Sequence, residues 1–329
     1  MMDNIGEVSF SPQQAGRLAI DMVESLRNKV AGGLTRNIAK IDEIVTPDRS
    51  GELITILGRP GMGKSQWLNW LSKQAVDDIE PESNEIVIRA TWEQSVEEDT
   101  LVWLAGDTNI SVTQLVRGEV DDSEFRILKL SAAKRALAPM WIIGHSNMEN
   151  QLRRRVRPRM GMIDIANAIE YICNDATPTK WKPKSIYLDY LQRIRPDTRG
   201  DRREQMMEIV DTSKDLAVSM GCPVYLGVQA GRQVDERSEP IPDMGDGQET
   251  SNIEQSSDKM WGLWYPLKTN DENSLVHGYK VTKHLFFAKL LKQKLGEFPV
   301  LFPLYIDPAH NKFAEIVKET GEAAAHWAA

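Results

Sequence analysis

Apolar and polar residues alternate in blocks through the middle of the chain. From about residue 34, short apolar runs that are typical of buried strands are separated by stretches with apolar residues at helical spacing. One predicted helix covers 203–219, and the predicted strands cover 53–57, 86–91, 140–143, 185–190 and 223–229. Such alternation predicts an α/β fold, in which helices cover both faces of a mostly parallel sheet.

The N-terminal part follows another pattern. Residues 1–10 are expected to be disordered, and a linker-like helix is predicted within 11–33, where Ser11 and Pro12 form a typical helix start. Its apolar face must be buried on its own domain or on a neighbouring subunit, and consists of Ala15, Leu18, Ala19, Met22, Val23, Leu26 and Val30.

The C-terminal part changes from polar to β-rich. Residues 231–258 are polar with scattered Pro and Gly, which predicts a long loop. Later apolar runs predict a β-rich extension with strands at 260–265, 285–291 and 300–306. We therefore expect one large domain over 34–318, followed by a flexible tail over 319–329.

Composition excludes several classes of protein. With 41% apolar residues the chain can bury a substantial core, and no apolar run is long enough to cross a membrane. The N-terminus lacks a signal-peptide pattern, and the two cysteines, Cys173 and Cys222, have no ligand spacing, so a cytoplasmic location is expected. A net charge of −8 argues against general nucleic-acid binding but leaves room for a locally basic channel.

One segment carries the strongest chemical signal. Residues 58–65 fit the phosphate-binding pattern G-x-x-x-x-G-K-[ST] at every fixed position, between a predicted strand and a predicted helix. In such a loop, backbone N–H groups surround phosphate, the lysine reaches the β- and γ-phosphates, and the serine ligates Mg²⁺. The sequence therefore predicts a site for ATP and Mg²⁺ that consists of Gly58, Arg59, Pro60, Gly61, Met62, Gly63, Lys64 and Ser65.

Three polar residues that follow predicted strands are candidates to complete this site. Asp189 ends an apolar strand, and an aspartate there holds Mg²⁺ beside a phosphate loop. Gln229 either bonds the γ-phosphate or meets water. Glu93 either polarises the attacking water or is a charge at the start of the next helix, and three carboxylates compete with it: Glu97, Glu98 and Asp99.

Two basic clusters stand out in this acidic chain. One spans residues 153–159 and is interpreted as a solvated helix face or a subunit contact. The other follows the Asp189 strand, at the edge where open α/β folds bind ligands, and consists of Arg193, Arg195, Arg199, Arg202 and Arg203. We expect this second cluster to contact single-stranded DNA, without base stacking because aromatic residues are not interleaved.

Several segments are similar to parts of one family. They are the phosphate-loop segment 51–65, Ile-Tyr-Leu-Asp-Tyr-Leu-Gln at 186–192, the segment 213–224, Gln229 with Arg232 and Arg237, and Ile-Glu-Gln at 253–255. With them, about residues 30–316 resemble the C-terminal, RecA-like ATPase domain of DnaB-type replicative helicases. The resemblance implies a RecA-like P-loop core and a hexameric ring, with ATP at each subunit interface and DNA in the pore.

The resemblance also implies roles for single residues. Glu93 matches the family's catalytic glutamate, and Gln229 matches its γ-phosphate sensor. Lys292 and Lys294 lie where the family has a Lys-Gln-Arg segment that reaches into the neighbouring subunit's ATP. Lys294 keeps the charge of the family's arginine but lacks its planar fork. The helix at 12–30 matches a linker helix that docks on the adjacent subunit.

One departure concerns the family's pore loop, which implies DNA contacts from Gln248, Glu249 and Ser251. Gln248 stands where the family has an arginine, and Ser251 stands where it has a glycine. The family's N-terminal helical domain has no counterpart in these 329 residues.

The sequence favours an ATP-hydrolysing ring motor, a helicase or translocase on single-stranded DNA, with a possible loader or replication partner and no membrane. The alternative is a nucleotide-controlled assembly or loading ATPase that acts on a protein partner with weak or no DNA unwinding. The retained Glu93 favours the motor. The lost pore-loop arginine and the absent N-terminal domain favour the alternative.

Overall fold

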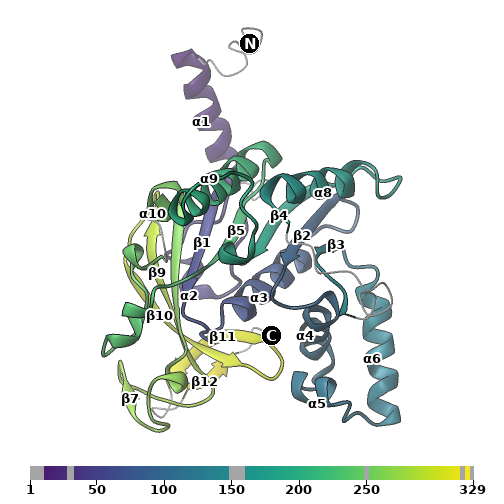
Figure 1. Ribbon diagram of the computed structural model, residues 1–329, viewed down its shortest axis with the longest axis vertical. Helices are drawn as coiled ribbons and strands as arrows, with labels where there is room; N and C mark the ends of the chain where they lie inside the picture. Colours follow the sequence, from purple (N-terminus) through teal and green to yellow (C-terminus); the bar gives the residue numbers. More distant parts are fainter. Residues whose placement is uncertain (1–10, 28–32, 148–159, 248–251, 319–322, 327–329) are drawn as a thin grey trace.

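Ten strands of the described chain form a single sheet at the centre of the protein (Figure 1). The structure is a computed structural model that describes residues 11–27, 33–147, 160–247, 252–318 and 323–326. The strands follow one another across the sheet in the order β12-β11-β10-β9-β6-β1-β5-β4-β2-β3. The strand β1, which leads into the phosphate loop, therefore has a hydrogen-bonded neighbour on each side.

Six of these strands pair in parallel, as the alternation of strands and helices predicted. Their bounds agree with the predicted ranges to within three residues. They are β1 (Leu53–Gly58), β2 (Glu85–Thr91), β3 (Met140–Ile143), β4 (Lys182–Asp189), β5 (Val224–Gln229) and β6 (Lys259–Trp264).

The remaining strands continue the same sheet with antiparallel pairing. They are β9 (Leu285–Gln293), β10 (Val300–Asp307), β11 (Lys312–Lys318) and β12 (Ala323–His326), and a separate hairpin joins β7 (Leu275–Val276) to β8 (Tyr279–Lys280). The β-rich extension is thus confirmed. The expected flexible tail is corrected in part, because β12 finds backbone partners on β11.

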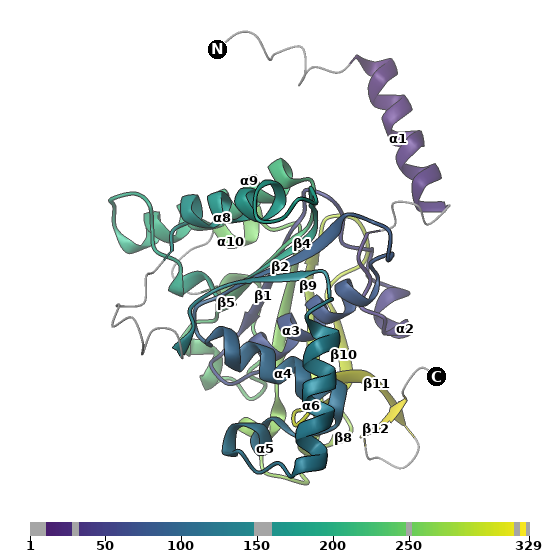
Figure 2. The same ribbon diagram turned by 90° about the vertical axis from the view of Figure 1, so that its right-hand side faces the viewer.

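Helices cover both faces of the sheet (Figure 2). On one face, Trp67 of α3 belongs to the same core as Ile54 and Ile56 of β1, and on the other face Leu53 and Leu57 share a core with α9. None of the described helices is long and apolar enough to cross a bilayer. The helices of the body are α2 (Ala39–Asp42), α3 (Lys64–Asp77), α4 (Val96–Thr108), α5 (Val112–Arg117), α6 (Asp122–Arg135), α8 (Met162–Asn174), α9 (Arg202–Met220) and α10 (Asn252–Ser256).

Within its described parts, 231–247 and 252–258, the predicted loop contains short helical turns. They are η3 (Arg232–Glu236), η4 (Met244–Asp246) and α10. The Arg237 guanidinium donates two hydrogen bonds to the Asp246 carboxylate, at 2.5 and 2.8 Å, and so ties this segment to itself. Both hydrogen bonding and charge keep the pKa of Asp246 below its usual range although the group is partly buried.

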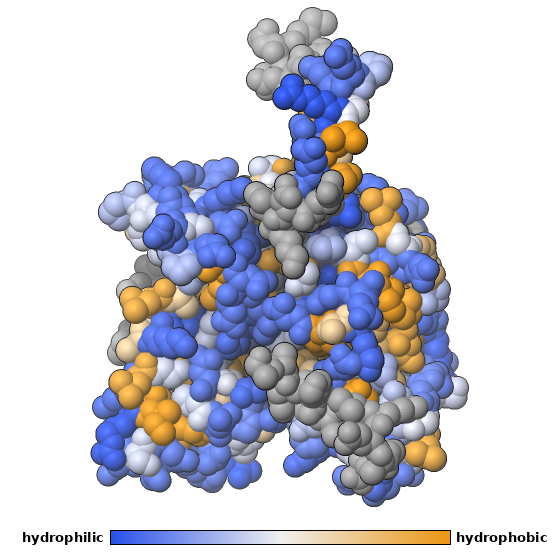
Figure 3. All heavy atoms as spheres, turned by 180° about the vertical axis from the view of Figure 1, so that it is seen from behind, coloured by the Kyte–Doolittle hydropathy of each residue, from blue (hydrophilic) through white to orange (hydrophobic). Residues whose placement is uncertain are grey.

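The helix α1 (Pro12–Arg27) stands apart from the body of the protein (Figure 1, Figure 3). Leu18, Met22 and Val23 on its predicted apolar face are 52%, 43% and 53% exposed. The interpretation that this face packs on its own domain is therefore wrong for these residues. The expected disorder of residues 1–10, and residues 28–32 of the linker segment, lie outside the described part of the chain.

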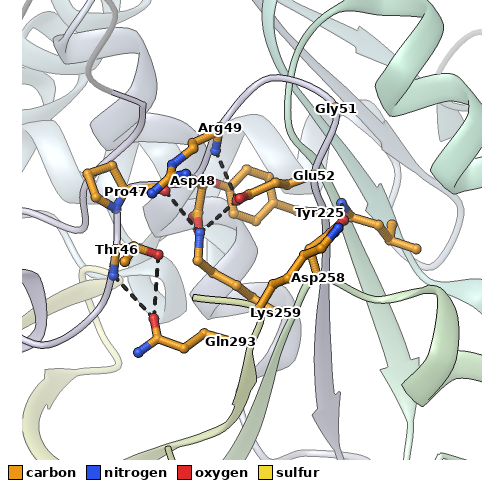
Figure 4. Close-up of polar contacts among 12 residues, drawn as sticks. Thr46, Pro47, Asp48, Arg49, Gly51, Glu52, Tyr225, Asp258, Lys259 and Gln293 are labelled. Atoms are coloured by element: carbon orange, nitrogen blue, oxygen red, sulfur yellow. Dashed lines mark hydrogen bonds and ion pairs between the residues drawn. The ribbon is translucent and has the colours of Figure 1, made fainter. Parts of the chain in front are cut away.

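A buried cluster of charges ties the segment before β1 to the sheet (Figure 4). The Asp48 carboxylate accepts hydrogen bonds from Arg36 at 2.5 Å and from the Tyr225 hydroxyl at 2.7 Å, and Lys259 lies 3.0 Å from it. The Lys259 ammonium also pairs with Glu52 at 2.7 Å. Burial alone would raise the pKa of Asp48, but the two cations lower it. The cluster therefore connects chain segments far apart in sequence through mutually compensated charges.

This cluster generates a stability prediction. The change Asp48→Ala leaves Arg36 and Lys259 buried with part of their charge uncompensated, and we expect it to lower the free energy of unfolding by about 3–5 kcal/mol. Urea denaturation followed by circular dichroism measures the change. As a control, Asp77→Ala breaks the half-exposed pair with Lys73 and should cost about 1 kcal/mol or less. Equal effects of the two changes would contradict the role given to the buried cluster.

Candidate active site

The loop between β1 and α3 has the strand–loop–helix form that its sequence predicted. Gly58 is the last residue of β1, and α3 begins at Lys64. Gly61 and Gly63 have φ angles of 76° and 82°, which side-chain-bearing residues rarely adopt. A Cβ atom on Gly63 would also lie 2.9 Å from the Phe286 ring. The glycines thus permit a tight loop whose N–H groups, with the α3 N-terminus, suit an anion.

Lys64 lies over this loop. Its ammonium group donates hydrogen bonds to the carbonyl oxygens of Gly58 at 2.8 Å and Arg59 at 3.2 Å. Burial lowers the pKa of Lys64 to about 8, although the negative charges of Asp189 and Glu93 act to raise it. The Arg59 side chain points elsewhere, since it pairs with Asp235 at 2.7 Å. Lys64 is therefore the cation of the loop that is held by neutral carbonyl acceptors, which a charged phosphate can replace.

Asp189 ends β4 and has the properties of an unused ligand. It is 2% exposed, and neither carboxylate oxygen has a hydrogen-bond partner at bonding geometry. Burial raises its pKa, while the Arg89 guanidinium and the Ser65 hydroxyl oppose this. Buried carboxylate oxygens without donors suit a hard cation such as Mg²⁺, which takes few protein ligands and completes its shell with phosphate and water. The residues present thus fit a magnesium site.

No other metal site is evident in the part of the chain that the structure describes. Within it, no group of three or more His, Cys, Asp or Glu side chains is close enough to hold an ion.

A cavity of about 430 Å³ brings most of the predicted residues together. It opens beside the phosphate loop, at the edge where the parallel strands end, and Tyr190, next to Asp189, forms part of its wall. The predicted residues that line it are Pro60, Gly61, Gly63, Lys64, Ser65, Glu93 and Gln229.

Glu93 is the carboxylate that remains available to this cavity. It lies between β2 and α4, which begins only at Val96, so it is not part of that helix. The three competing carboxylates have structural partners. Glu97 accepts from Ser146, Glu98 forms a capping box with Ser95, and Asp99 pairs with the buried Arg89 at 2.6 Å.

Gln229 ends β5 and is held in place through its backbone. Its N–H group donates to the Gln192 side-chain oxygen at 3.1 Å, and the Gln192 amide donates to the Gln229 carbonyl oxygen at 3.4 Å. Gln192 belongs to η2 (Leu191–Arg193), just after β4. This clamp joins the strand end of Gln229 to that of Asp189, a positioning role that the sequence alone did not reveal.

Lys292 and Lys294 lie at the opposite edge of the sheet. Because β9 is antiparallel to β6 and Lys292 pairs with Met260, both lysines lie where the parallel strands begin. Lys292 donates to the carbonyl oxygens of Glu254 and Ser257 at 2.6 and 2.8 Å. Lys294 is 73% exposed, with Asp258 at 3.7 Å. Neither residue lines the phosphate-loop cavity of its own chain.

Of the candidate DNA residues, the four arginines that the structure describes are exposed, and one of them is paired with an aspartate. Arg195 pairs with Asp164 at 2.8 Å, and Arg199, Arg202 and Arg203 lie on the surface where the chain enters α9. Gln248, Glu249 and Ser251, like the basic segment 153–159, lie outside the described residues.

The sequence is similar to replicative helicases along most of its length. The family model of the DnaB-like helicase C terminal domain matches residues 33–304. The replicative DNA helicase DnaB of Leifsonia xyli is 24% identical over 74% of this chain and 50% of that protein. The DnaB of Geobacillus stearothermophilus is 23% identical over 92% of this chain and 61% of that protein. The chain thus spans about half the length of the curated relatives it matches.

Two solved structures have the same fold. One, described as an ATPase domain, superposes with a TM-score of 0.76 and 17% identity, over 94% of this chain and 100% of that chain. A DnaB-like replicative helicase, described with its interactions with primase, superposes with a TM-score of 0.71 and 17% identity, over 87% of this chain and 64% of that chain. The predicted RecA-like α/β fold is confirmed.

The lowered pKa of Lys64 predicts a pH dependence of nucleotide binding. A bound triphosphate stabilises the charged ammonium group of Lys64. Above a pH of about 8 this group is mostly neutral in the free protein, so binding of the triphosphate is coupled to uptake of a proton. We expect the affinity for Mg²⁺-ATP to fall by up to about tenfold per pH unit above that value. Calorimetric titration over this range measures it. Lys64→Arg, whose charge is permanent, should lose the slope. A flat profile for the unaltered protein would contradict this account.

Proposed function

Because the chain belongs to the DnaB-like helicase C-terminal domain family, we propose that it is an ATP-hydrolysing motor that acts on single-stranded DNA. The observation that carries this proposal is the cavity beside the phosphate loop, which is lined by Lys64, Ser65, Glu93 and Gln229. Transfer of a γ-phosphoryl group to water needs four parts, and these side chains supply them: a cation that binds phosphate, a metal ligand, a general base and a γ-phosphate sensor.

In this proposal each residue has one task. The loop N–H groups and Lys64 bind the β- and γ-phosphates. Glu93 accepts a proton from the attacking water as its oxygen bonds to the γ-phosphorus, while the bond from that phosphorus to the β,γ-bridging oxygen breaks and ADP leaves. The Gln229 amide bonds the γ-phosphate, and the clamp with Gln192 transmits its loss to the segment after β4. The Ser65 hydroxyl and the Asp189 carboxylate would hold Mg²⁺, which would neutralise charge on the phosphate oxygens.

The proposed assembly is a ring of several copies, six in the resemblance. The uncovered apolar face of α1, with Leu18 and Met22, supports docking on a neighbouring copy, because exposed apolar faces favour association. Lys294 is exposed at the sheet edge away from its own cavity, which supports action on the ATP of the adjacent copy. Lys292 holds backbone carbonyl groups near α10 and, in this assembly, positions the segment that carries Lys294.

Single-stranded DNA is the proposed track, with contacts from Arg195, Arg199, Arg202 and Arg203, and from Gln248, Glu249 and Ser251. Guanidinium groups match phosphate oxygens and act without reading bases. One solved relative is described with its interactions with primase, so a replication protein is the proposed partner. The buried free thiols of Cys173 and Cys222 fit work in a reducing cytoplasm.

A second candidate function is a nucleotide-controlled loading or assembly ATPase with a protein partner. The observation that favours it is the pairing of basic side chains in the two loops that would grip DNA. Arg195 pairs with Asp164, and Arg237 forms two hydrogen bonds with Asp246, so part of the positive charge is already neutralised.

The role of Glu93 is tested by Glu93→Gln. We expect ATP binding to persist, because the phosphate loop is untouched, while turnover falls by about 10²-fold or more. Steady-state phosphate release and equilibrium nucleotide binding measure the two effects. The control Glu82→Gln changes an exposed carboxylate that does not line the cavity and should leave turnover unchanged. Normal turnover of Glu93→Gln would remove this residue from the mechanism.

The two candidate functions differ in their response to DNA. For the motor, we expect single-stranded DNA to raise the steady-state ATPase rate several-fold at low salt, and moderate salt to reduce this stimulation because phosphate contacts release counterions. Arg199→Ala should weaken the stimulation and leave the rate without DNA unchanged. A rate that is indifferent to DNA at both salt concentrations would favour the loading ATPase.

A further inference from the structure

Part of the cavity wall comes from elements that the proposed catalytic residues do not belong to. It consists of Val102 of α4, Val112 of α5, and Pro308 and Asn311 of the turn between β10 and β11, and we call this part of the lining the apolar end. This turn follows the matched family segment, which ends at residue 304. The lining is therefore polar and charged where the phosphate loop and strand ends contribute, and largely apolar where α4, α5 and this turn contribute.

The turn is fixed against the helical wall opposite it. The Val112 N–H group donates to the Ala309 carbonyl oxygen at 3.0 Å, and a ring nitrogen of His310 lies 3.1 Å from the Asn109 carbonyl oxygen. Lys312 donates to the Asn109 side chain at 3.0 Å. These contacts hold the two sides of the apolar end at a set separation, so this end is preformed.

Asn311 has an unsatisfied acceptor in this preformed end. Its side-chain amide donates to Asn69 at 3.3 Å, but its side-chain oxygen has no hydrogen-bond partner, although the residue is only 7% exposed. Asn311 lines this cavity and also an adjoining one of about 460 Å³. A buried oxygen acceptor without a donor is costly, and a ligand that supplies one would be favoured.

We propose that the apolar end is the nucleobase subsite and that Asn311 selects the base, with its side-chain oxygen accepting a hydrogen bond from the exocyclic amine of adenine. This inference rests on the proposed function, because the triphosphate on the phosphate loop fixes the other end of the ligand. Val102, Val112 and Pro308 supply apolar contact for the flat base. The cavity volume falls within the ~300–1,000 Å³ that is typical of small-molecule sites.

The chemistry of the acceptor sets the preference. A base with an exocyclic amine donates to the Asn311 oxygen, whereas a base with a carbonyl group at that position presents a second acceptor and leaves both oxygens unpaired. Sites that hydrogen-bond a substrate group discriminate strongly against analogues that lack it. Adenine nucleotides are therefore favoured over hypoxanthine nucleotides, which differ from them by this single replacement of amine by carbonyl.

The test compares binding of ADP and inosine diphosphate, neither of which has a γ-phosphate to lose, to the full chain with Mg²⁺ by calorimetry. We expect the unaltered protein to prefer ADP by about tenfold or more. The variant Asn311→Gly removes the amide and suits the local φ angle of 50°, so it should fold and bind both ligands with affinities within about twofold of each other.

A matched control is Asn273→Gly. Asn273 also has a positive φ angle, of 72°, but it is exposed and lines neither cavity, so this variant should keep the full preference for ADP. Thermal unfolding of both variants confirms that they are folded.

Several outcomes would overturn the inference. Equal binding of the two diphosphates to the unaltered protein would remove base selection. A preference that persists in Asn311→Gly would assign it to another residue, and equal weakening of both ligands would assign Asn311 to the ribose or to folding. If the unaltered protein binds neither diphosphate nor ATP, the proposed function fails with it, whereas ATP binding without base preference leaves that function intact.

Discussion

Parallel pairing of β1 with its two neighbours is the constraint on which the rest of this structure depends. Parallel strands end at a common edge of the sheet, so residues that are distant in sequence are brought to one place. Gly58 lies opposite Gln229 in the register of β1 with β5, and Thr91 lies opposite Asp189 in that of β2 with β4. A shift of the first register would separate the phosphate loop from Gln229, and a shift of the second would separate Asp189 from Glu93, which follows β2.

The two edges of the sheet carry different chemistry. The carboxyl edge holds the cavity that Lys64 lines and, at the end of β4, the buried Asp189 carboxylate, which has no hydrogen-bond partner. The opposite edge holds the compensated charge cluster around Asp48 and, beside it, the exposed Lys294. Because Lys294 lies where the parallel strands begin and the phosphate loop lies where they end, Lys294 cannot reach the phosphate loop of its own chain. In the proposed ring, the edge of one copy that carries Lys294 would face the cavity of the next copy.

Much of this arrangement could be predicted from the sequence, for physical reasons. Buried parallel strands consist of continuous apolar runs, and the phosphate loop depends on glycines at fixed spacing, so β1 to β6 and residues 58–65 were recognisable. The turn at Pro308 and Asn311 was not, because its position depends on antiparallel pairing and on contacts with α5, which lies far away in sequence. The clamp by Gln192 and the engagement of Lys292 with backbone carbonyl groups likewise depend on tertiary contacts that spacing does not encode.

The most direct test of this account is a crystal structure of the protein with Mg²⁺ and a non-hydrolysable ATP analogue. The account predicts that the triphosphate lies on residues 58–65 with Lys64 at its β- and γ-phosphates, and that Mg²⁺ lies beside Ser65 and Asp189. It also predicts the adenine between Val112 and Asn311. An analogue bound outside this cavity, or a cavity that stays empty at saturating analogue, would contradict it.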